Sequence, residues 1–171
     1  MILDVLHNQF CKVDEFKNYL NNIVRTEYNG VLGSYQYTGT DILPVIPNDA
    51  ECSFSYWRQE GEYNTLKKDL GGCNYDYLLQ GKFIFIYYSR DKKKEDVLFK
   101  LINQNLSAAT SIDSNLSFEI KKHNTNKLDV LKNEYKNKTL DTFLLFNDCT
   151  YMSVQVDISY LAKESCVSEC I

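Results

Sequence analysis

The chain has few of the residues from which most enzyme sites are built. It contains two histidines and one tryptophan in 171 residues, and it has no GxSxG, HExxH, Walker or GxGxxG motif. His7 falls in a helical pattern and His123 in a Lys/Asn-rich turn, where neither is placed as a catalytic base. Its acidic pairs lie in turns and loops, without the spacing of a metal-dependent nuclease. We therefore expect no enzyme, no catalytic residue and no cofactor.

Proline, glycine and positive charge are also scarce. Two prolines and seven glycines argue against a disordered chain or a long flexible linker. A formal net charge of -4 excludes the class of basic proteins that wrap nucleic acid. No stretch approaches the roughly 18 apolar residues of a membrane span, and the first ten residues lack the basic start of a secretory signal. We expect a protein that is made in a cytoplasm and has no membrane contact.

Six cysteines are spread along the chain without a CxxC pair. Scattered cysteines in a cytosolic protein are usually small buried apolar residues that stay reduced. Cys166 and Cys170 form a CxxxC, but a zinc site needs two more ligands, and the chain has only two histidines to offer. We predict no metal site and leave the role of this cysteine pair open.

Alternation of apolar and polar residues is the clearest pattern that is present. In "MSVQVDISY", residues 152–160, every second residue is apolar, which predicts a half-buried strand. Its polar side chains are Gln155, Asp157 and Ser159. These side chains face water in one interpretation. In the other they face the lumen or a contact surface of an assembly. Thirteen tyrosines and nine phenylalanines favour β structure and contact surfaces.

The remaining periodicities predict one α+β domain over residues 1–161, followed by a polar tail over 162–171. Apolar stripes predict helices over 2–10 and 14–28, and the second helix ends at Asn29-Gly30. A third helix follows the turn at 89–96 and runs to about residue 106. We predict strands over 52–58, 83–88, 111–122, 142–148 and 150–161. This order is typical of a mainly antiparallel sheet with helices packed on one face.

Three segments do not fit that pattern. Residues 30–50 hold both prolines and predict an edge strand or an extended arm on a surface, or an ordinary covering loop. Residues 59–76 are polar and contain three glycines, which predicts a long loop, either without regular structure or with a short helix around 63–70. Residues 123–141 are charged and predict a short helix or the tip of a hairpin.

An apolar extended arm is a frequent device for holding a neighbouring subunit. Trp57, the single tryptophan, either anchors such an interface or covers the edge of the core. The candidate interface residues are Tyr35, Tyr37, Ile42, Val45, Ile46 and Trp57.

The layout resembles a known family. The strand "GKFIFIYYSRD" leads into the helix "KKEDVLFKLINQNL", and the long strand "TYMSVQVDISYL" closes the sheet. Over residues 14–161 this arrangement resembles the tail-terminator and tail-completion proteins of tailed bacteriophages, including the neck and tail ring proteins of crAss-like phages. The resemblance implies a tail-terminator-like fold and a structural protein of the virion. It also implies a hexameric or dodecameric ring at the head–tail junction or tail, with portal, neck or tail proteins as neighbours.

In such a ring DNA passes through the lumen as non-specific cargo. The resemblance then implies that Gln155, Asp157 and Ser159 face the lumen or a neighbouring subunit, where acidic groups repel DNA and let it slide. An alternative is a small phage-encoded binding module that acts on a host protein. That module would be monomeric or dimeric and would expose one aromatic patch around Trp57.

Overall fold

The structure is a computed structural model that describes residues 2–16, 18–45, 53–71, 74–91, 93–126, 129 and 149–165. The helical elements in this part of the chain are α1 (Ile2–Phe10), a 3₁₀ turn (Asp14–Phe16) and α2 (Glu95–Ile112). The strands are β1 (Tyr19–Leu20), β2 (Ile23–Tyr28), β3 (Val31–Tyr37), β4 (Ile42–Pro44), β5 (Ser53–Gly71), β6 (Asn74–Ser89), β7 (Leu116–Asn124) and β8 (Thr150–Ser165).

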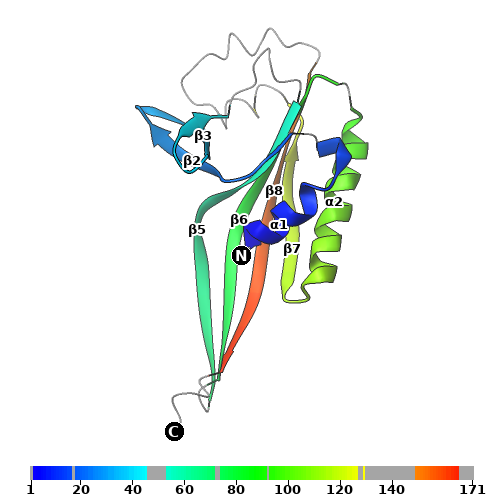
Figure 1. Ribbon diagram of the computed structural model, residues 1–171. Coiled ribbons are helices and arrows are strands. Elements are labelled where there is room, and N and C mark those ends of the chain that lie inside the picture. The colour runs from blue at the N-terminus through cyan, green and yellow to red at the C-terminus, as the bar shows by residue number, and fades with distance from the viewer. Residues whose placement is uncertain are drawn as a thin grey trace.

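Five strands form a large sheet in the order β1-β5-β6-β8-β7. Its pairs are antiparallel except for the short parallel contact of β1 with β5. Both helices lie on one face of this sheet (Figure 1). The predicted α+β fold, with a mainly antiparallel sheet and helices on one face, is confirmed.

The main core lies between the helices and that face. The α1 helix buries Ile2, Leu6 and Phe10, which are four residues apart and so share one side of a helix. The α2 helix buries Leu98, Ile102, Leu106 and Ala109 against the same core. From β8, the alternating residues Met152, Val154, Val156 and Ile158 point into it, as the period of two predicts.

A second, smaller sheet of β2-β3-β4 packs on the opposite face of the large sheet, at one end. Ile23 of β2 and Val45, which follows β4, are buried there against Phe54, Tyr56 and other large-sheet residues. This end of the large sheet is therefore covered on both faces. That explains why residues 83–88 at the end of β6 are apolar on both sides.

The helix predicted over 14–28 is wrong. Only Asp14–Phe16 is helical, and β2 begins at Ile23. Asn29 and Gly30, taken as a helix stop, form a two-residue hairpin turn between β2 and β3, with φ of 50° and 75°. Positive φ at both positions is the requirement of a type I′ turn, for which Asn-Gly is the preferred pair. The β-branched residues Ile23 and Val24 then fit the strand better than a helix.

The loop predicted over 59–76 is also wrong, because β5 continues to Gly71 and β6 begins at Asn74. Residues 61–68 of β5 are exposed and belong to neither core cluster, so this part of the sequence lacks the apolar alternation that marks a half-buried strand. For residues 30–50, the edge-strand alternative is confirmed at β4, which ends at Pro44 on the rim of the small sheet. It is wrong for β3, which lies in the same segment and is the central strand of that sheet.

The last strand is longer than predicted. It continues to Ser165, into the segment taken as a polar tail. Residues 46–50, the predicted strand 142–148, most of segment 123–141 and residues 166–171 lie outside the described residues.

Candidate assembly surface

Three strands of the large sheet extend past both helices and past the small sheet (Figure 1). We call this projection the arm; it is distinct from the extended arm predicted for residues 30–50. It consists of residues 63–71 of β5, 74–80 of β6 and 159–165 of β8. At its tip β5 turns into β6. A three-stranded sheet normally needs a packed face to be stable. Toward the tip of the arm, neither the helices nor the small sheet covers a face (Figure 1).

Apolar side chains form rows across both faces of the arm. On one face Leu66 pairs with Leu78, which pairs with Leu161. On the other face Leu79 pairs with Tyr160, which packs against the main core. Leu66 remains 52% exposed, so the leucine row offers apolar surface to solvent, as surfaces that contact other proteins do.

Among the described strands, none covers the outer edge of the arm. β1 pairs with β5 only at Ser55 and Tyr56. In the part of the chain that the structure describes, no strand pairs with the outer edge of β5 beyond Tyr56. An open edge presents backbone N–H and C=O groups that accept another strand.

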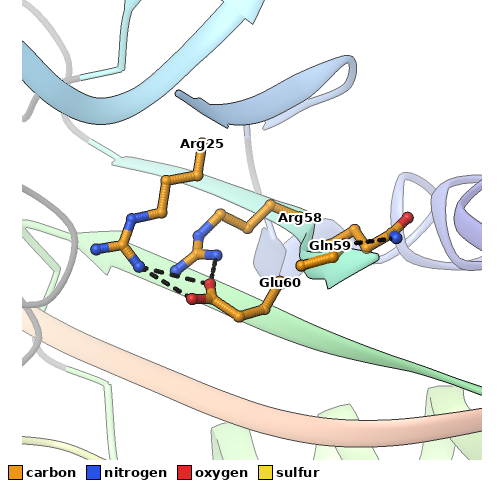
Figure 2. Close-up of polar contacts among 5 residues, drawn as sticks. Arg25, Arg58, Gln59 and Glu60 are labelled. Atoms are coloured by element: carbon orange, nitrogen blue, oxygen red, sulfur yellow. Dashed lines mark hydrogen bonds and ion pairs between the residues drawn. The ribbon is translucent and has the colours of Figure 1, made fainter. Parts of the chain in front are cut away.

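The arm leaves the body of the protein at a bulge in β5. The register with β6 shifts between Glu60 and Asn64, and Gly61 has φ of 73°. Gln59 donates a hydrogen bond from Nε2 to the Gly61 carbonyl at 2.8 Å (Figure 2). Bulges of this kind bend a strand and increase its twist, so this one sets the direction of the arm.

A cluster of charged residues stabilises the chain just before the bulge. Glu60 accepts hydrogen bonds from Arg58 and, at 3.2 Å, from Nη1 of Arg25 (Figure 2). Arg58 is fully buried, and a buried guanidinium needs a paired charge. Because Arg25 belongs to β2, the cluster also ties the small sheet to the base of the arm.

The same cluster determines the charge of Glu60. Partial burial acts to raise the pKa of its carboxyl group, but hydrogen bonds and positive charge from Arg58, and to a lesser degree from Arg25, outweigh that effect. The net result is a pKa below the ordinary 4.5. Glu60 is therefore ionised at neutral pH, as the ion pair requires.

The predicted lumen residues lie on the face opposite the helices. Gln155, Asp157 and Ser159 are half-buried there, and the last two line a groove of about 430 Å³ at the base of the arm. Asp157 pairs in register with Lys82 and lies 3.8 Å from Nζ of Lys121. The surface around Asp157 is therefore mixed in charge, whereas the resemblance implied an acidic surface.

The predicted interface residues are divided by the structure. Trp57 is fully buried, with its ring centroid 5.2 Å from that of Phe10, so the core alternative is correct and the interface alternative is wrong. Tyr35 and Val45 are also buried and offer no surface to a partner.

Two of the others line a second groove. Tyr37 is 50% exposed, and with Ile42, Val24 and His7 it lines a mainly apolar groove of about 470 Å³ between α1 and the small sheet. Burial lowers the pKa of the His7 imidazole, which donates to or accepts from the Tyr19 hydroxyl at 2.5 Å. Ile46 lies outside the described residues.

Other kinds of site receive no support from the described ranges. These ranges hold no group of three or more His, Cys, Asp or Glu side chains that could bind a metal ion. None of the helices described here is long and apolar enough to cross a membrane. No family model and no curated protein matches the chain, so the geometry of the arm is the main guide to function.

We predict that Glu60→Gln lowers the free energy of unfolding by about 1 kcal/mol near neutral pH. It removes the carboxylate that pairs with the buried Arg58 charge, but the Glu60 side chain is 40% exposed and solvent screens the pair. The pKa of Glu60 is lowered in the folded state. The stabilisation by the ion pair is therefore complete at pH values above the ordinary pKa of the carboxyl group. It is lost as the pH falls through the lowered pKa of the folded state. Urea unfolding of both proteins across this range is the measurement.

The exposed Glu27 of β2 provides the control, and Glu27→Gln should leave stability nearly unchanged. A penalty for Glu60→Gln that stays constant from neutral to acidic pH would contradict the role assigned to the ion pair.

We also predict that Gly81→Ala destabilises the base of the arm by about 1–3 kcal/mol. A Cβ at this position would lie 2.8 Å from Cε2 of Phe83 and 2.9 Å from Cε1 of Tyr63. Phe83 is fixed in the core. In a Tyr63→Leu background one of the two rings is removed, so the penalty measured by urea unfolding should shrink. An equal penalty in both backgrounds would count against this packing.

Proposed function

We propose that the protein is a structural subunit that assembles with copies of itself through the arm. The observation that carries this proposal is the arm itself, which has an exposed leucine row on one face and an outer edge that no described strand covers. A sheet of this kind gains stability when a partner buries it, since burying a leucine contributes about 1.5–3 kcal/mol. In this role the protein has no catalytic activity and needs no cofactor.

We further propose that the assembly is a ring, hexameric or dodecameric, at the head–tail junction or in the tail of a bacteriophage virion. This step depends on the resemblance of the strand–helix–strand layout to tail-terminator and neck proteins. DNA would pass through the lumen as non-specific cargo, and portal, neck or tail proteins would be the neighbours. The groove lined by Asp157 and Ser159 would face the lumen or an adjacent subunit.

The test is the native mass of the purified chain by light scattering across a concentration series. We expect a species of about six or twelve times 19.9 kDa. Leu66→Lys should weaken assembly about tenfold or more, because it puts a charge into an apolar row of the arm.

Leu43→Lys is the matched control, because Leu43 on the small sheet is 50% exposed and Leu66 is 52% exposed. It should assemble like the original chain. If both substitutions have the same effect, the arm is not the assembly surface. If the chain is a monomer at every concentration and is missing from purified virions, the alternative of a binding module for a host protein is favoured.

A further inference from the structure

The open edge of β5 carries a charge pattern that is complementary to itself. Between Gly61 and the tip of the arm, an exposed acid, Glu62, lies at one end, and two exposed lysines, Lys67 and Lys68, lie at the other, followed in the sequence by Asp69. Thr65 is in the middle. Opposite charges on facing strands stabilise a pair, and like charges destabilise it.

We propose that this edge binds the same edge of a second copy, antiparallel and about a two-fold axis at Thr65. This inference rests on the proposed function and names the contact. In an antiparallel pair centred on Thr65, Glu62 of each copy faces Lys68 of the other. The two copies of Thr65 face each other, which is a favourable cross-strand pair.

The side chains lie on the faces that this pairing needs. Glu62 and Asn64 line the groove on the face opposite the helices, and alternation places Leu66 and Lys68 on that face too. On the other face Tyr63 contacts Phe83, and Lys67 lies 5.6 Å from the ring centroid of Tyr77.

Residues that face each other in an antiparallel pair share a face. The pairing therefore adds a contact of Tyr63 with Lys67 of the second copy, a cation–π arrangement. It also makes the two copies of Leu66 diagonal neighbours, which merges the exposed leucine rows of the two arms.

Other registers are less favourable. Moving the centre from residue 65 to residue 67 sets Lys67 against its own copy. Moving it to residue 64 sets Lys68 against Glu60, but Lys67 then faces Gly61, where the positive φ interrupts the strand. Lysines on an edge strand normally prevent pairing. Here Glu62 of the second copy compensates the charge of Lys68 only when the pair is centred on Thr65.

The pairing has a consequence for the assembly. A two-fold contact uses the same surface of both copies and closes on itself. It therefore joins two subunits without adding a third. In a ring, such a contact joins two rings through their arms, so that a dodecamer would consist of two hexamers facing each other.

Charge exchange tests this contact at positions that are exposed in the single chain. Lys68→Glu and Glu62→Lys should each raise the dissociation constant of the two-fold contact about tenfold or more, because each places like charges opposite one another twice. The double variant should restore association. An equimolar mixture of the two single variants should also restore it, because every pair is then opposite in charge.

Sedimentation velocity of the full chain at low ionic strength is the measurement, since salt screens exposed pairs. Lys100→Glu, at an exposed position of α2 away from the arm, is the control for net charge and should leave association unchanged. Single variants that weaken association without rescue by the mixture would overturn the register.

Two further outcomes separate this inference from the function on which it rests. If the original chain assembles and the single variants assemble equally well, the edge contact is wrong while the structural role stands. If the original chain sediments only as a monomer at all concentrations, both the contact and self-assembly are contradicted.

Discussion

The ion pair of Glu60 with Arg58 and Arg25 is the interaction on which the rest of the structure depends. It lies where β5 changes from a strand packed on both faces to one that projects into solvent. On one side of it, Tyr56 and Trp57 are fully buried. On the other side, Gly61 bends the strand away. Since Arg25 comes from β2, the cluster holds the small sheet, the large sheet and the base of the arm in one fixed relation.

The body of the protein could be predicted well from its sequence because its periodicity follows its core. The stripe Ile2, Leu6 and Phe10 and the alternation along 152–160 are buried as expected. The helix predicted over 14–28 was wrong because the local pattern of apolar residues does not distinguish a short amphipathic helix from an edge strand followed by a hairpin. The Asn29-Gly30 turn, with positive φ at both residues, was the signal that could have decided it.

The candidate site was predicted least well, for a physical reason. Hydrophobic patterning reports burial within one chain, and the arm is not buried within one chain. Residues 59–76 therefore resembled a loop, although the described ones belong to the distal part of the β5–β6 hairpin. The single tryptophan, which attracted attention as an anchor, belongs to the core. A useful signal was the pair of widely spaced leucines, Leu66 and Leu70, in a polar segment bounded by glycines.

The central claim is that the arm becomes buried when copies of the chain assemble. Amide hydrogen exchange, measured on the dilute chain and on the concentrated assembly, tests this most directly. We expect the amides of 62–70 to exchange quickly in the dilute chain and to become protected on assembly, while those of α2 stay unchanged. Equal protection of 62–70 in both samples, with assembly confirmed by mass, would contradict the claim and place the contact elsewhere on the molecule.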